Sequence, residues 1–155
     1  MLYNMKFLRT DGQDRDFAEN CRRLDADLEA RVGREIQRSK YEKYNQLDAI
    51  HEAIVVYEDG VLAGAGAIRR YDDASVELKR IYVSPMFRRK GIAQELVSQL
   101  IQWAKEVGDR RMLLETGEKL SGSIALYAKL GFERIPNYGP YADMPESICM
   151  AREIQ

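Results

Sequence analysis

Arg88, Arg89 and Lys90 stand directly before Gly91, where a strand pattern ends and a helical pattern begins. The first backbone N–H groups of a helix have no intrahelical partner, and the helix dipole favours an anion beside them. A glycine lets a ligand approach the backbone without a Cβ in the way. The stretch from Arg88 to Ala93 is therefore a candidate phosphate site. On local composition alone, the alternative is an exposed basic helix cap with a glycine turn.

Two common phosphate-binding motifs do not fit this stretch. The dinucleotide fingerprint requires the glycine spacing G-x-G-x-x-G, and the P-loop requires Gly-Lys followed by Ser or Thr. The chain contains neither pattern. A Rossmann fold and a P-loop NTPase are thus disfavoured.

The spacing Arg88-x-x-Gly91-x-Ala93, after the strand pattern ELKRIYV, resembles the pyrophosphate motif of the GNAT family of N-acetyltransferases. The resemblance extends from Ala53 to the end of the chain and includes LLETG and SIALYAKLGF. Many members have a second glycine where this chain has Ala93, and we expect the small side chain to be tolerated there.

The resemblance implies acetyl-coenzyme A as cosubstrate, and the cysteine and histidine content of the sequence favours no metal. The pantetheine arm would lie where the sheet opens between the strands at 75–83 and 112–116. Its amides would hydrogen-bond like an added strand to the backbone of Ile81, Tyr82 and Val83. The pyrophosphate would accept hydrogen bonds from backbone N–H groups between Arg89 and Ala93, within a site made of Arg88, Arg89, Lys90, Gly91, Ile92 and Ala93.

Tyr127 lies in LYAKLGF, where the family commonly has a tyrosine whose hydroxyl meets the departing thiolate of coenzyme A. A phenol with a pKa of about 10 can donate that proton at neutral pH. Without the resemblance, a core tyrosine on an amphipathic helix is the simpler interpretation. Leu120 replaces an asparagine that contacts the cofactor in many members, so we expect that contact to be absent or to be replaced by Ser121 or Ser123.

Glu77 precedes the end of its strand at the position where some members have a glutamate that deprotonates the substrate ammonium, directly or through water. It could equally pair with Lys79 or with neighbours of Arg80 on a solvated edge. Strand alternation places Glu77, Lys79, Ile81 and Val83 on one face unless a bulge intervenes. Glu115, on the adjoining strand, is the alternative base or a ligand of the substrate ammonium.

Four tyrosines occupy the two least regular segments of the sequence, where loops commonly carry specificity. Aromatic rings together with the two glutamates favour a cationic amine as acceptor. Each tyrosine alone is more often a packing residue. These tyrosines are Tyr41, Tyr44, Tyr138 and Tyr141, and we expect the acceptor to be bound by Glu115, Tyr138 and Tyr141.

The elements that would position these residues alternate between strand and helix patterns. Strands are predicted at 6–9, 53–57, 61–69, 75–83, 112–116, 132–135 and 147–154. A helix is predicted from Asp14 or Asp16 to Gly33, and a short one at 124–130 that ends at Gly131. The segment 34–46 is either a short helix or an ordered loop. A long helix from Ile92 to Gly108 has an apolar face formed by Ile92, Leu96, Leu100, Trp103 and Val107.

Connection lengths predict an antiparallel meander for the strands up to residue 83 and a parallel strand-helix-strand unit after it. The resemblance implies the fold class: α/β, with a GNAT-like, mixed, mostly antiparallel sheet of six or seven strands, helices on both faces, and a splay at the cofactor cleft. The length of 155 residues and the lack of a linker predict one domain over 1–155.

Composition excludes several classes of protein. The 24 basic and 25 acidic side chains give a net charge of -1, so no overall field favours nucleic acid or a membrane surface. Cys21 and Cys149 have no metal or redox spacing and are expected to be buried, and one histidine, His51, excludes a His-rich metal site. No membrane-length apolar run or cleavage signal occurs, which favours the cytoplasm.

We therefore expect an N-acetyltransferase that transfers an acetyl group to a primary amine by direct attack in a ternary complex. Cys149 lacks a neighbouring histidine motif and is not needed as a nucleophile. The alternative is a catalytically silent acyl-coenzyme A-binding regulatory module, against which the retained Tyr127 argues. A nucleotide-binding domain has only the basic loop in its favour. The acceptor is a small-molecule or peptide amine of unknown identity, and the sequence is compatible with a homodimer.

Overall fold

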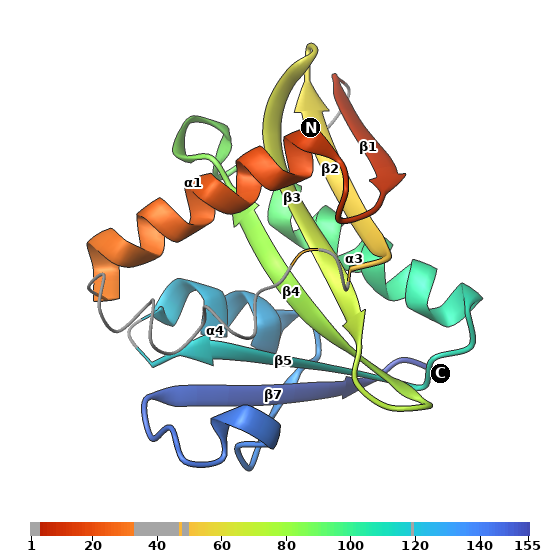
Figure 1. Ribbon diagram of the computed structural model, residues 1–155, viewed down its shortest axis with the longest axis vertical. Helices are drawn as coiled ribbons and strands as arrows, with labels where there is room; N and C mark the ends of the chain where they lie inside the picture. Colours follow the sequence, from red (N-terminus) through yellow and green to blue (C-terminus); the bar gives the residue numbers. More distant parts are fainter. Residues whose placement is uncertain (1–3, 33–46, 48–49, 119) are drawn as a thin grey trace. The chain divides into compact units, whose positions relative to one another are not determined.

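The computed structural model describes residues 4–32, 47, 50–118 and 120–155, which form three α-helices and a seven-stranded sheet (Figure 1). The strand order is β1-β2-β3-β4-β5-β7-β6. The strands are β1 (Met5–Thr10), β2 (Glu52–Glu58), β3 (Val61–Arg70), β4 (Ser75–Val83), β5 (Arg111–Gly117), β6 (Glu133–Ile135) and β7 (Ser147–Glu153). The helices are α1 (Arg15–Val32), α3 (Ile92–Glu106) and α4 (Ser121–Lys129), with 3-10 turns at Pro85–Phe87 and Gly139–Tyr141.

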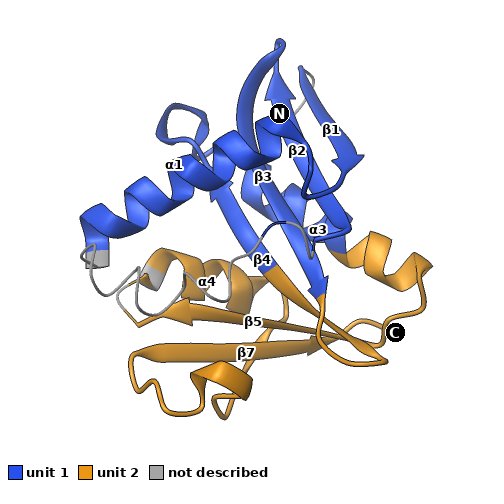
Figure 2. Ribbon diagram, in the orientation of Figure 1, with its two compact units in different colours: residues 1–69, 79–100 blue, residues 70–78, 101–155 orange. Residues whose placement is uncertain are grey.

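The chain divides into two compact units whose segments alternate along the sequence (Figure 2). Unit 1 comprises residues 1–69 and 79–100, and unit 2 comprises residues 70–78 and 101–155. β4 and α3 each contribute residues to both units.

In unit 1, α1 begins at an aspartate cap. The Oδ1 atom of Asp14 accepts hydrogen bonds from the N–H groups of Asp16 at 2.8 Å and Phe17 at 2.9 Å. This confirms Asp14, one of the two predicted caps. The helix then buries Phe17 and Cys21 in one apolar cluster with small and branched side chains of β2 and β3: Ala53, Val55, Leu62, Ala65 and Ala67.

The glycines of β3 face the opposite side, since side chains alternate along a strand. A side chain at Gly66 would lie 2.2 Å from Cδ1 of Ile81 and 3.3 Å from Cδ2 of Leu96 on α3. The alanines of β3 therefore pack on the face that α1 covers. The glycines leave room for α3 to pack closely on the other face. This confirms helices on both faces within unit 1, as Figure 1 also shows.

The predicted apolar face of α3 is partly wrong. Ile92, Leu96 and Leu100 are buried, but Val107 is 56% exposed because the helix ends at Glu106. The buried stripe continues instead through Ile101 and Ala104.

In unit 2, β5 pairs with β7, and β7 with β6, both antiparallel. The start of β4 pairs in parallel with β5 through Ser75–Glu77, which confirms the predicted parallel unit. Gly131, with φ 91°, follows the end of α4, as predicted. Within the described residues, no helix has both the length and the apolarity needed to cross a membrane.

Candidate functional site

The loop between β4 and α3 belongs to unit 1 and is anchored at both ends. The N–H group of Ser84 donates to the carbonyl oxygen of Ala63 at 2.9 Å. Phe87 is buried, and the N–H group of Arg88 donates to the carbonyl oxygen of Pro85 at 3.2 Å. The backbone that leads into α3 is therefore held in one shape by contacts with the rest of unit 1.

Arg89 and Gly91 both adopt left-handed conformations, with φ 64° and 82°. The N–H group of Glu95 donates to the carbonyl oxygen of Gly91 at 3.1 Å, so the N–H groups of Ile92, Ala93 and Gln94 precede the first intrahelical donor. A Cβ at Gly91 would meet no atom of the described residues within 4 Å, apart from its own chain neighbours. The loop thus presents a helix start with open space beside it, which fits a diphosphate group.

The three cations of this loop have different surroundings. The Nε of Arg88 donates to the carbonyl oxygen of Val83 at 2.8 Å, and its guanidinium lies 5.3 Å from the ring centroid of Tyr82. The Nζ of Lys90 lies 2.9 and 3.1 Å from the carboxylate oxygens of Glu58. Arg89 is exposed. Arg88 and Lys90 therefore brace the loop, a role that the sequence alone did not indicate.

The strand before the loop is not regular. Arg80 has φ 60°, a left-handed value inside β4, whereas Ile81 and Tyr82 are half-buried and Val83 is buried. Regular alternation from residue 77 to residue 83 is therefore interrupted, and an irregularity of this kind is the exception that the prediction of a shared face allowed.

In unit 2, Glu77 and Tyr138 form a hydrogen-bonded pair. The hydroxyl of Tyr138 donates to Oε2 of Glu77 at 2.5 Å, and Glu77 is only 9% exposed. The ring of Tyr138 meets Tyr71 and Tyr141 edge to face, with centroid separations of 5.2 and 5.6 Å. Burial raises the pKa of the Tyr138 hydroxyl, and the Glu77 charge and hydrogen bond raise it further. Glu77 thus lies beside an aromatic cluster rather than on a solvated edge.

Glu115 has a separate partner on β7. Its Oε2 accepts a hydrogen bond from the buried hydroxyl of Ser147 at 2.7 Å. Glu115 is half-buried and lies opposite Cys149 in the β5–β7 register. The carboxylate is therefore oriented by a neighbouring strand, as a binding or proton-accepting group requires.

Tyr127 is buried on α4 and packs edge to face against Phe132 at a centroid separation of 5.9 Å. Burial raises the pKa of its hydroxyl, so the phenol keeps its proton at neutral pH. Ser123, in the first turn of the same helix, is half-buried. Unit 2 thus holds Tyr127 as a protonated phenol on a short helix.

Several predicted residues lie outside these groups. Tyr41 and Tyr44 fall outside the described residues, as does the segment 34–46. Cys21 and Cys149 are buried and unbridged, as predicted, and His51 is exposed. Among the described residues, no cluster of three or more histidine, cysteine, aspartate or glutamate side chains could hold a metal ion.

Sequence reasoning missed two neighbours of the predicted residues, Tyr71 and Ser147. Tyr71 lies at the turn between β3 and β4 and contacts Tyr138, which is distant in sequence. Ser147 is the first residue of β7. The pairing of β5 with β7 brings Ser147 close to Glu115, whereas no local feature of the sequence marks the contact between Tyr71 and Tyr138.

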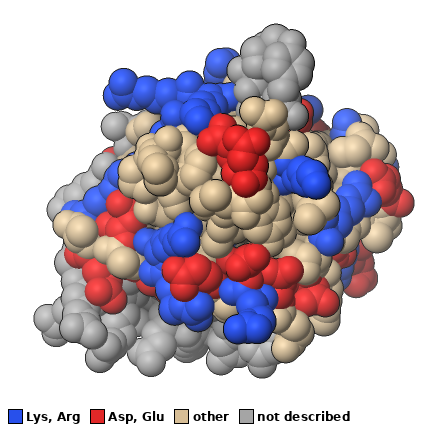
Figure 3. Space-filling view, turned by 90° about the horizontal axis from the view of Figure 1, so that it is seen from above, with Lys and Arg blue, Asp and Glu red and all other residues tan. Residues whose placement is uncertain are grey.

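Charge is not segregated on the face of the molecule drawn in Figure 3, where basic and acidic side chains are interspersed. The net charge of -1 agrees with this distribution. A net charge near zero gives no general attraction for anions, so an anion site would have to depend on local groups.

Comparison with known proteins places these features in a family context. The family model described as "Acetyltransferase (GNAT) family" matches residues 17–132. The chain is 32% identical over 100 residues to the uncharacterized N-acetyltransferase YsnE of Bacillus subtilis, covering 63% of this chain and 66% of the relative. It is 35% identical over 96 residues to an aminoglycoside N(6')-acetyltransferase type 1 of Salmonella typhimurium, covering 56% and 66%.

Two solved structures share the fold. A putative acyl-CoA N-acyltransferase from Klebsiella pneumoniae has a TM-score of 0.81 at 23% identity, covering 97% of this chain and 98% of that chain. The PaiA N-acetyltransferase from Thermoplasma acidophilum, solved with coenzyme A, has a TM-score of 0.75 at 18% identity, covering 96% and 98%. By sequence, the matched part spans 66% and 50% of the first two curated relatives.

Proposed function

Because the chain belongs to the acetyltransferase (GNAT) family, we propose that it transfers an acetyl group from acetyl-coenzyme A to a primary amine by direct attack in a ternary complex. The observation that carries this proposal is the backbone before α3, where left-handed Arg89 and Gly91 precede a helix start with open space beside it. A helix start of this kind suits a phosphate group.

The cofactor-binding residues proposed are the backbone groups of Ile81–Val83 and the loop Arg88–Ala93, with Ser123 and Tyr127 from α4. Arg89 and the N–H groups of Ile92 and Ala93 would hold the pyrophosphate, while Arg88 and Lys90 keep the loop in shape. Acetyl-coenzyme A would supply the acetyl group as a thioester with a thiolate leaving group. The Thermoplasma protein of the same fold was solved in complex with coenzyme A, which supports this choice of cofactor.

Glu77 is the proposed base that accepts the proton of the substrate ammonium, and Tyr127 the proposed donor to the thiolate. Glu77 has little solvent exposure and an orienting partner in Tyr138, both of which suit proton transfer at a fixed place. Tyr127 keeps its proton because burial raises its pKa. Glu115, oriented by Ser147, is the alternative base or a ligand of the ammonium.

The proposed acceptor is a cationic amine. The ring of Tyr138, which is hydrogen-bonded to Glu77, contacts the rings of Tyr71 and Tyr141, and ring faces and carboxylates both favour ammonium groups. The aminoglycoside N-acetyltransferase among the relatives is named for an acceptor that carries amino groups.

Binding and turnover separate the proposed function from its alternatives. We expect coenzyme A to raise the melting temperature of the chain, and ATP and NAD to leave it unchanged. With acetyl-coenzyme A and a panel of amines, free thiol should appear at a rate that depends on the amine. Stabilisation by coenzyme A without thiol release across the panel would instead favour a catalytically silent acyl-coenzyme A-binding regulatory module.

A further inference from the structure

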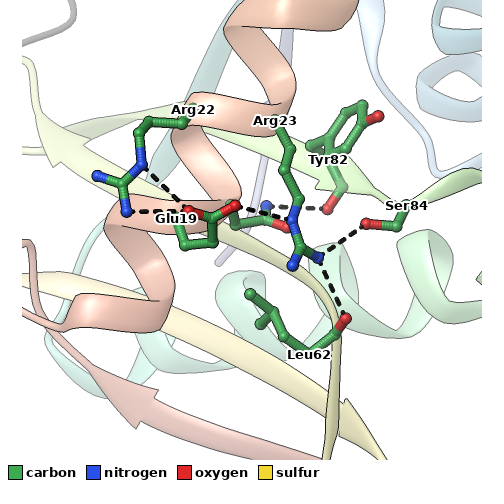
Figure 4. A network of polar contacts seen from close by, with 7 residues as sticks. Glu19, Arg22, Arg23, Leu62, Tyr82 and Ser84 are labelled. Carbon is green, nitrogen blue, oxygen red and sulfur yellow. Dashed lines mark hydrogen bonds and ion pairs between the residues drawn. The ribbon is translucent and has the colours of Figure 1, made fainter.

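Helix α1 makes direct polar contacts with the second half of β4, all within unit 1. Asn20 is fully buried, and its Nδ2 donates to the carbonyl oxygen of Tyr82 at 3.1 Å. Nη1 of Arg23 lies 3.3 Å from the hydroxyl of Ser84 and 3.4 Å from the carbonyl oxygen of Leu62 (Figure 4). These contacts tie α1 to the strand segment that leads into the cofactor loop.

Arg80, at the start of this segment, makes the most extensive contact with α1. Its Nη1 and Nη2 each lie 3.0 Å from a carboxylate oxygen of Asp25, and Nη2 also donates to the carbonyl oxygen of Cys21 at 3.2 Å. The guanidinium is buried, while the Asp25 side chain is 44% exposed. An arginine thus reaches from β4 to α1 and forms a bidentate pair there.

Arg80 also has a backbone conformation that residues with a Cβ rarely adopt. Arg80 has φ 60°, and its Cβ strains a left-handed conformation that only glycine adopts freely. Strain of this kind persists only where surrounding contacts hold the residue in place. The pair with Asp25 and the bond to the Cys21 carbonyl are such contacts.

We use the name α1 clamp for the contacts that Asn20, Arg23 and Asp25 make with Arg80–Ser84. We infer that the α1 clamp fixes the backbone conformation of Ile81–Val83 for coenzyme A binding. Arg80 is then a positioning residue. The inference rests on the proposed function, because it assigns those three residues to pantetheine. Strand-like binding needs N–H and C=O groups in fixed directions. The φ angle of residue 80 determines the directions of the peptide groups that follow it.

A pair of substitutions separates this role from a contribution to stability alone. Arg80→Ala and Arg80→Gly both remove the pair with Asp25, but only the glycine adopts φ 60° without strain. Titration calorimetry with coenzyme A should show affinity reduced about tenfold or more in Arg80→Ala and within about threefold of wild type in Arg80→Gly. Equal losses in the two variants, or no loss in either, would overturn the inference.

Asp25→Ala provides a second test of the inference. It removes the carboxylate partner of Arg80 at a partly exposed position and leaves residue 80 as arginine. As a single substitution, Asp25→Ala should weaken coenzyme A binding. In the Arg80→Gly background it should cause no further loss of affinity. Additive effects of Asp25→Ala and Arg80→Gly would count against the clamp. Arg70→Ala is the matched control, because Arg70 pairs with Asp109 at 2.6 Å within unit 2, and it should leave affinity unchanged.

Hydrogen exchange in the free protein tests the clamp independently of the cofactor. Amides of residues 81–83 should exchange faster in Asp25→Ala than in wild type, with no such increase when Arg80→Gly is already present. If wild type does not bind coenzyme A, the proposed function fails. The exchange data would still decide whether the α1 clamp fixes the backbone conformation of residues 81–83. Unchanged exchange in Asp25→Ala would show that it does not.

Discussion

The contact between Glu77 and Tyr138 gives unit 2 a carboxylate with a defined direction. The tyrosine hydroxyl donates to Oε2 at 2.5 Å, and two further rings surround the tyrosine. A carboxylate that has little exposure and is oriented by a hydrogen bond is a better candidate for proton transfer than one on a solvated strand. This contact is the strongest structural support for choosing Glu77 as the base.

The roles proposed for Tyr127 and Glu77 predict different kinetic signatures. Tyr127→Phe keeps the ring and its packing against Phe132, so folding and coenzyme A binding should persist while turnover falls by about 10²–10⁴. Glu77→Gln cannot accept the proton, so its defect should shrink as pH rises and the amine deprotonates unaided. Steady-state kinetics from about pH 6 to 10 measures both. Wild-type turnover in both variants would contradict the roles proposed for Tyr127 as proton donor and Glu77 as base.

The Tyr138 hydroxyl predicts an alkaline limit to stability. Its pKa in the folded chain is raised, by burial first and by Glu77 second, above the value of about 10 expected in the unfolded chain. The unfolded state therefore releases this proton first, so the stability is fully present below about pH 10 and is lost as pH rises further. Urea unfolding from about pH 8 to 11 should show a steeper fall for wild type than for Tyr138→Phe. Parallel profiles would contradict this.

At the scale of elements, β4 and the helix ends were accessible from local sequence. Ser75–Val83 matches the predicted strand, and α1, α3 and α4 begin or end beside Asp14, Gly108 and Gly131, because caps and glycines act within a turn of the chain. The Glu77–Tyr138 pair was not predictable in this way. Its partners are 61 positions apart and meet only in the folded chain.

The left-handed conformation of Arg80 is another feature that local sequence could not predict, although it lies within a single strand. The strand pattern around it predicts regular alternation, and nothing local marks an arginine for φ 60°. The partner that we propose holds it there, Asp25, lies 55 positions away on α1. The candidate residues of the cofactor loop were named from the sequence, whereas the bracing of Arg88 by Val83 and of Lys90 by Glu58 emerged from the fold.

The start of α3 can be tested at Gly91. Gly91→Glu introduces a carboxylate where the proposed site needs an anion, so coenzyme A binding should be abolished. Gly91→Asn, neutral and tolerant of a left-handed backbone, should retain more affinity. Gly108→Glu is the matched control, since Gly108 also has a positive φ, 95°, and open space around it. Calorimetric titration of a folded Gly91→Glu variant with unchanged affinity would remove the site from this loop.

At the scale of the whole molecule, a net charge of -1 gives no general attraction for anions. The proposed recognition of both substrates therefore relies on local groups: backbone N–H groups and Arg89 for the cofactor, and carboxylates with aromatic rings for the acceptor. The groups named for the pyrophosphate lie in unit 1 and those named for the acceptor in unit 2, whereas Ser123 and Tyr127, which are also proposed for the cofactor, lie in unit 2. Changes in one set should then affect one substrate more than the other.

Acceptor recognition tests this division. Tyr138→Ala removes both the ring and the hydrogen bond to Glu77, so the KM for a cationic amine should rise while affinity for coenzyme A stays near that of wild type. A panel of cationic, neutral and acidic amines should show turnover for cationic acceptors. Turnover confined to neutral or acidic amines, with Tyr138→Ala silent, would contradict a cationic acceptor.

The most direct measurement is the mass of the amine after incubation with the purified chain and acetyl-coenzyme A. The amine should gain one acetyl group in step with the release of free coenzyme A, and this should depend on the chain and fall sharply in Tyr127→Phe. Transfer without a covalent intermediate also predicts that the protein itself gains no acetyl group when the amine is omitted. If coenzyme A binds but no amine in a broad panel gains mass, the chain is not the N-acetyltransferase proposed here.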